Sequence, residues 1–161
     1  MQRPAKLPLT KGGQQIGLTR FIFVFMEVIM TQIVFADSVG TGIRYTVATG
    51  ASLFVSNNVT VGSTDSDAIQ AAGNAANVMI FGSVFGLGAG ITLGNQAGSS
   101  ATMVIGDSGI VAAQSYGVSL YNAGSHLTNA GQIMSGAVGV LISANAGAAV
   151  RIQFRQHPRR R

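Results

Sequence analysis

Three aspartates in the middle of the chain, Asp65, Asp67 and Asp107, are the side chains best suited to hold a metal ion. Two of them lie in the stretch S63TDSDA68, and Asp107 could join them if successive parts of the chain stack suitably. Calcium takes six to eight oxygen ligands, and the closing glutamate of an EF-hand loop is missing here. We therefore interpret these aspartates first as solvated turn residues, and a calcium site is the alternative.

The glycine-rich stretch G82SVFGLGAGITLG94 resembles a phosphate-binding loop in composition. The dinucleotide-binding motif G-x-G-x-x-G must lie between a strand and a helix. Gly86 and Gly88 fit its first two glycines, but Ile91 occupies the third position and no helical periodicity follows. We predict that these glycines form turns and bind no phosphate.

The tetrapeptide G106DSG109 imitates the sequence around the nucleophilic serine of chymotrypsin-like proteases. That chemistry requires a histidine base and a carboxylate that orients it, and in that family both precede the serine. The two histidines of this chain, His126 and His157, both follow Ser108. We predict that this segment is a turn and that His126 is a turn or surface residue.

The charged residues are distributed in a way that argues against catalysis and against nucleic-acid binding. Residues 45–150 contain three Asp, one His and no Glu, Lys or Arg, whereas the whole chain has a net charge of +5. Polysaccharide hydrolases and lyases need paired carboxylates or a carboxylate with a basic partner. Nucleic-acid binding needs cations on the folded surface. We predict no enzyme, no cofactor and no nucleic-acid partner, and the absence of cysteine excludes disulfides and thiolate metal ligands.

The glycines recur at a fixed spacing, which is the strongest pattern in the chain. Three stretches share it: V78MIFGSVFGLGAGITL93, I105GDSGIVAAQSYGVSL120 and L127TNAGQIMSGAVGVLI142. Each has two glycines eight residues apart. Aliphatic residues stand four positions before and two positions after the first glycine, and also one and three positions after the second glycine. The copies are spaced by 27 and 22 residues. V59TVGSTDSDAIQAAG73 is a decayed earlier copy, in which Ala68-Ile69 replaces Gly-Ile.

A period of 20 to 30 residues is typical of proteins built from stacked repeats. Aliphatic residues alternate within each copy, which is the period of a β-strand, and Gly, Asn, Asp and Ser between the strands supply turns. We predict an all-β fold, a right-handed parallel β-helix of about four coils over residues 30–150, with coils about 4.8 Å apart. Its interior would hold Val84, Ile91, Leu93, Val111, Val118, Leu120, Ile133, Val140 and Ile142.

The region before the repeats, residues 1–29, is predicted to be an N-terminal extension or leader. Its apolar run F21IFVFMEVIMTQIVFA36 is sixteen residues long and contains Glu27, whereas a membrane span needs about 20 apolar residues. Three interpretations stay open: translation that starts at Met30, a secretory signal, or a segment that caps or joins the core. No membrane span is predicted in the repeat domain.

The last eleven residues, 151–161, contain five arginines after about a hundred residues with none. We predict a basic C-terminal tail there. The alternative is that the abrupt change marks a truncation or a change of reading frame, so that the chain is a fragment of a longer protein.

The phrases L127TNAGQIMSGAVGVLIS143 and G109IVAAQSYGVSL120 resemble repeats of bacterial autotransporter passengers and large secreted adhesins. They are similar as well to the β-helical segments that precede calcium-binding nonapeptide arrays in proteins exported by type I secretion. The resemblance covers about residues 45 to 150. It implies a parallel β-helix that serves as a structural or adhesive segment of a bacterial secreted or cell-surface protein.

The resemblance also bears on partners and on alternative functions. The expected partners are further coils of a longer chain, a second copy stacked on an unpaired strand edge, or a host or surface glycan. One alternative is a calcium-binding secreted module with Asp65, Asp67 and Asp107 as ligands. A polysaccharide-active β-helix enzyme is the remaining alternative.

Overall fold

The computed structural model describes residues 31–94, 100–121, 124–143 and 151–154, the last four through their backbone alone. These residues form sixteen short strands, β1 to β16, and no helix. Residues 1–29, predicted as an extension or leader, and residues 155–161 of the predicted basic tail lie outside the described residues.

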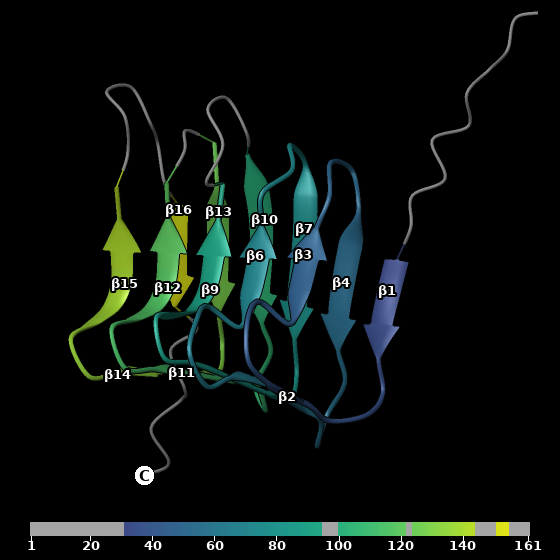
Figure 1. Cartoon of the computed structure of the whole chain (residues 1–161). Helices are drawn as coiled ribbons and strands as arrows, with labels where there is room; N and C mark the ends of the chain where they lie inside the picture. The colour runs from purple at the N-terminus through teal and green to yellow at the C-terminus, as the bar shows by residue number, and fades with distance from the viewer. Residues whose placement is uncertain (1–30, 95–99, 122–123, 144–150, 155–161) are drawn as a thin grey trace, which may run out of the picture.

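The strands form three parallel sheets, and each turn of the chain contributes one strand to every sheet (Figure 1). Sheet A contains β1 (Thr31–Val34), β4 (Ser52–Val55), β7 (Ala76–Ile80), β10 (Ala101–Ile105), β13 (His126–Asn129) and β16 (Arg151–Phe154). Sheet B contains β2 (Ser38–Gly40), β5 (Thr60–Ser63), β8 (Ser83–Gly86), β11 (Ile110–Ala113) and β14 (Gln132–Ser135). Sheet C contains β3 (Tyr45–Val47), β6 (Ile69–Ala71), β9 (Ala89–Leu93), β12 (Tyr116–Leu120) and β15 (Val138–Ile142).

Three consecutive strands make one rung of a right-handed parallel β-helix, so that β1–β3 are rung 1 and β13–β15 are rung 5. In Figure 1 the chain rises through sheet C at the front, descends through sheet A at the back and advances from right to left. The five strands of sheets B and C are separated by four steps along the axis, which agrees with the predicted number of about four coils. The predicted fold class is confirmed.

The register of sheet B confirms the repeat. Val111 pairs directly with Val84 on one side and with Ile133 on the other, as the spacing of 27 and 22 residues requires. The decayed copy is confirmed as well, because Ile69 pairs with Ile91.

One position of the predicted repeat alignment is wrong. The alignment equates Val78 with Ile105, but Val78 pairs with Met103, and Ile105 pairs with Ile80. The cause is the turn after β10: Gly106–Gly109 is two residues longer than the Phe81–Gly82 link after β7. Glycine spacing alone does not reveal that insertion.

Inward-facing side chains of the five rungs form one continuous apolar core. Successive rungs place aliphatic residues directly above one another, as in the row of Ile69, Ile91, Val118 and Val140 in sheet C. Full burial of such a side chain contributes about 1.5–3 kcal/mol. Because one rung cannot bury its own inward side chains, the rungs depend on stacking for stability.

Several inward side chains of the final rung are incompletely buried. Ile133 and Val140 are only partly buried against the core, and Ile142 is 45% exposed. The prediction that Ile142 fills the interior is therefore wrong in the described structure. Its side chain follows Leu120 in the inward row, but no described strand pairs with β15 on its other side.

The first glycine of each pair lies where two rungs approach each other closely. A Cβ on Gly109 would lie 2.4 Å from the Ile80 carbonyl oxygen, and one on Gly131 would lie 2.2 Å from the Gly109 carbonyl oxygen. No side chain fits at such distances, so the corner between sheets A and B requires glycine. This accounts for Gly82, Gly109 and Gly131 without any ligand.

Candidate functional site

Asp67 connects two rungs at the corner between sheets B and C. Its Oδ1 accepts a hydrogen bond from the Ala89 N–H at 2.7 Å, and its Oδ2 accepts one from the Thr92 hydroxyl at 2.7 Å. Both donors belong to the following rung. Both carboxylate oxygens thus join one rung to the next, and charge-assisted hydrogen bonds of this kind are strong.

Asp65 and Asp37 also connect neighbouring rungs through their carboxylates. Asp65 Oδ1 accepts from the Gly42 N–H at 2.5 Å, and Asp37 Oδ1 accepts from the Thr60 N–H at 2.7 Å. The bonds of Asp37 and Asp65 join residues 23 apart, so each runs from one rung to its neighbour. Asp37 was not singled out from the sequence, and its separation of 23 residues from Thr60 lies within the range of repeat spacings.

The third predicted ligand lies elsewhere. Asp107 is exposed in the turn between sheets A and B of rung 4, whereas Asp65 and Asp67 lie between sheets B and C of rung 2. The structure therefore does not bring the three aspartates together. Among the residues described, no three His, Cys, Asp or Glu side chains gather in a geometry that could hold a metal ion.

Ser108 and His126 also lie where no catalytic pair can form. Ser108 is in the predicted turn after β10, and its hydroxyl is directed to the Phe81 carbonyl oxygen at 2.7 Å and to Asn57 Oδ1 at 2.9 Å. His126 is an exposed residue at the start of β13. The serine thus stabilises the corner between sheets A and B across the stacked rungs.

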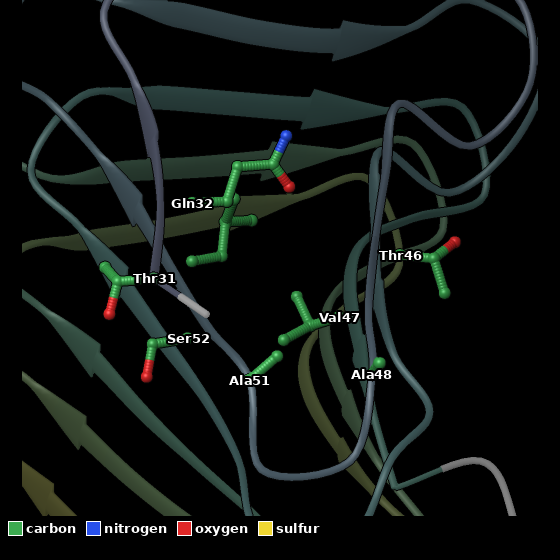
Figure 2. A pocket seen from close by; sticks show the side chains of 8 residues that line it. Thr31, Gln32, Thr46, Val47, Ala48, Ala51 and Ser52 are labelled. Atoms are coloured by element: carbon green, nitrogen blue, oxygen red, sulfur yellow. The ribbon is translucent and has the colours of Figure 1, made fainter. Parts of the chain in front are cut away.

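A pocket of about 480 Å³ opens at the N-terminal end of the helix (Figure 2). Its apolar wall comes from Val47, Leu53 and the Ala48–Ala51 loop, and its polar lining from Gln32 and three hydroxyl side chains, those of Thr31, Thr46 and Ser52. None of these side chains titrates near neutral pH. The pocket is the open end of the core and offers no group that could transfer a proton.

Comparison with known proteins adds no relative to this description. No protein-family model, no curated protein sequence and no solved structure matches the chain. Among the described residues no helix has the length and apolar character needed to cross a membrane. The function of the β-helix must therefore be inferred from the residues on its own surface.

The outer face of sheet A carries an apolar row that the sequence analysis missed. Strand register sets Ile33, Phe54, Met79 and Val104 side by side, all on the side opposite the core. The rings of Phe54 and Phe81 lie 5.4 Å apart, tilted by 33°. We name these five residues the outer apolar row. Ile33, Phe54, Met79 and Val104 follow one another at separations of 21, 25 and 25 residues, one from each turn of the chain.

The outer face of sheet C differs in character. The corresponding row there begins with four polar residues that pair strand by strand, Thr46, Gln70, Thr92 and Ser119, and ends with Leu141 on β15. Thr46 and Gln70 are at least partly exposed, whereas Thr92 and Ser119 are buried at 5% and 1% exposure.

The outer face of sheet B also carries an apolar row, made of Val39, Gly62, Phe85, Ala112 and Met134. The outer apolar row of sheet A is distinguished from it by its pair of neighbouring aromatic rings.

Proposed function

We propose that the chain is a structural and adhesive β-helical segment of a bacterial secreted or cell-surface protein, without catalytic activity. The outer apolar row is the observation that carries the adhesive part of this proposal. Ile33 is exposed and the other four residues of the row are partly exposed, and a contiguous apolar surface of this kind commonly marks an interaction site. The resemblance of the repeats to autotransporter passengers and secreted adhesins supports the location.

The proposed structural role, that of a rigid spacer, is supported by the way in which the rungs are joined. Backbone ladders link every rung to the next in three sheets, and carboxylates of Asp37, Asp65 and Asp67 reinforce the corners. Because each rung contacts only its neighbours, the length of such a solenoid is set by the number of repeats. A spacer needs this combination of stiffness and adjustable length.

Glycans are the partner that the outer apolar row suits best among those considered. The ring of Phe54 on β4 lies beside the ring of Phe81, which directly follows β7, and Phe54 is only partly buried. Aromatic rings pack on apolar surfaces with energies of about 0.5–1.5 kcal/mol beyond their area, and a pyranose ring offers such a surface on its C–H face. We therefore assign the row as a sugar-stacking surface.

A glycan array probed with the fluorescently labelled full chain tests this function. We expect binding to at least one class of immobilised glycan, and we expect Phe54→Leu to weaken that binding about two- to tenfold because the aromatic face is lost. Phe85→Leu is the matched control, since Phe85 lies on the outer face of sheet B and covers Gly62. Absence of binding to every glycan, or equal losses in the two variants, would refute the proposal.

A further inference from the structure

A second row of side chains runs along the outer face of sheet A, beside the outer apolar row. On β1, β4, β7 and β10 its members lie two residues before those of the outer apolar row, and the strand register sets them side by side. We name this set the outer polar row: Thr31, Ser52, Asn77, Thr102 and His126. Successive members are one strand spacing apart, about 4.8 Å, and the two rows are about 7 Å apart along each strand.

The protein leaves the side chains of the outer polar row free to bind a ligand. No hydrogen bond or ion pair among the described residues engages the side chains of Ser52, Asn77 and Thr102. Asn77 Oδ1 is even buried without a hydrogen-bond partner, which is costly for an amide oxygen. On sheet C, by contrast, the Thr92 hydroxyl is bonded to Asp67. The outer polar row therefore offers a line of donors and acceptors that a ligand can satisfy.

The outer face of sheet A is also uncharged along these two rows. The outward side chains described on β1, β4, β7, β10 and β13 include no Asp, Glu, Lys or Arg. Carboxylates, phosphates and anionic lipid headgroups are recognised by Lys and Arg side chains. A neutral ligand that combines hydroxyl groups with an apolar surface suits this face better than an anionic one.

The combination of two continuous rows is a feature of sheet A. On sheet B the residues that correspond to the outer polar row include Ile110, so an aliphatic side chain interrupts the row in rung 4. Its apolar row contains Gly62, which the Phe85 ring covers. On sheet C, Thr92 and Ser119 are buried. Sheet A is therefore the face on which apolar and polar contacts can repeat together from rung to rung.

We propose that the ligand of this face is an extended, neutral, β-linked polysaccharide that lies parallel to the helix axis and crosses the strands of sheet A. The inference rests on the proposed function and adds the class of glycan and its direction. The C–H face of each sugar ring packs on the outer apolar row, and hydroxyl groups at the ring edge reach the outer polar row. Sugar hydroxyls both donate and accept, as do the side chains of Ser52, Asn77 and Thr102.

The spacing of the rungs favours an extended chain over a compact or branched glycan. Each ring of an extended β-linked polysaccharide advances by a distance close to the strand spacing, so that successive rings meet successive rungs. From Thr31 to His126 the outer polar row covers five strands, or about 19 Å, which accommodates about four to five rings. A membrane would instead place the unbonded polar side chains of this row against hydrocarbon, which is unfavourable.

Calorimetric titration of the full chain tests the inference, with neutral β-1,4-linked oligosaccharides of glucose, N-acetylglucosamine and mannose as probes. For at least one series we expect the dissociation constant to fall by at least about tenfold from the disaccharide to the pentasaccharide and to change little with a further ring. Acidic β-1,4-linked oligosaccharides of mannuronate should bind more weakly at every length. Absence of binding by all neutral hexasaccharides, or an affinity that does not depend on length, would overturn the inference.

Thr102→Val removes one hydroxyl from the outer polar row and keeps the shape of the side chain. It should weaken hexasaccharide binding about two- to tenfold, because one hydrogen bond is lost. Thr46→Val is the matched control, since Thr46 is an exposed threonine on the outer face of sheet C, and it should leave binding unchanged. Both side chains are exposed, so both variants should keep the melting temperature of the wild type.

The results also separate this inference from the proposed function. If Phe54→Leu weakens glycan binding but Thr102→Val does not, ring stacking alone holds the glycan, so the inference fails and the proposed function stands. If no glycan binds at all, both fail. Self-association, or binding to phosphatidylcholine vesicles, that Phe54→Leu abolishes and the hexasaccharides do not inhibit would assign the face to a second copy of the chain or to a membrane, and would contradict the inference.

Discussion

Replacement of Gly109 with alanine is expected to lower the free energy of unfolding by about 3 kcal/mol. The added Cβ would lie 2.4 Å from the Ile80 carbonyl oxygen and 2.8 Å from Ile105 Cγ2. The carbonyl is part of the backbone of the preceding rung, so relief requires the corner between sheets A and B to open. For a chain of this size such a loss corresponds to a decrease of about 6–12 °C in melting temperature, which thermal unfolding followed by circular dichroism measures.

Gly139→Ala is the matched control for this experiment. The substitution is chemically identical, but an added Cβ at Gly139 has no atom of the described residues within 4 Å. In dilute solution its effect should stay within about 0.5 kcal/mol. Equal losses in the two variants would show that the destabilisation comes from glycine replacement in general and that the close approach of rungs at Gly109 is not its cause.

Truncation of Leu120 to alanine is expected to cost about 2–5 kcal/mol. Leu120 is fully buried, and its row in sheet C continues to Leu93 on one side and to Ile142 on the other. The strands above and below are held in register by backbone hydrogen bonds and cannot close around the space left by the side chain. The cavity should therefore remain, which is the condition for a large loss.

Ile142→Ala provides the comparison for Leu120→Ala. It removes a similar aliphatic side chain from the same inward row, but Ile142 is 45% exposed at the end of that row. Its cost in dilute solution should be below about 1 kcal/mol. Urea titrations of both variants measure the difference, and a larger loss for Ile142→Ala would be incompatible with the described position of rung 5.

The fold was predictable because equivalent residues of successive repeats are the residues that pair between neighbouring strands. Residues such as Val84, Val111 and Ile133 are spaced by the length of one turn, and the structure pairs them directly. Rung 1 shows the limit of this approach. Gln32 and Ser38 replace aliphatic residues there, so no repeat was evident even though the strands form.

The polar groups were less predictable than the core, because their contacts depend on exact register. Asp65 and Asp67 are two residues apart in the sequence, yet Asp65 bonds to the preceding rung and Asp67 to the following one. A search for clusters of carboxylates therefore suggested a calcium site where the structure has hydrogen-bonded corners. The outer apolar row was overlooked for a related reason. Alternation within one strand identifies the residues that face the core, but only alignment of successive rungs shows that their outward-facing residues are also apolar.

Disulfide trapping measures the central claim, the parallel in-register stacking of rungs, most directly. The chain contains no cysteine, and Thr102 and His126 are outward-facing direct partners on β10 and β13. Cysteines at these two positions should form a disulfide rapidly under mild oxidation, because in-register neighbours lie within the Cα separation that a disulfide spans, about 4.4–6.8 Å. A pair at Thr102 and Thr128, on the same face but two residues out of register, should react far more slowly. Equal rates for the two pairs, or faster trapping of the second, would contradict the stacked helix described here.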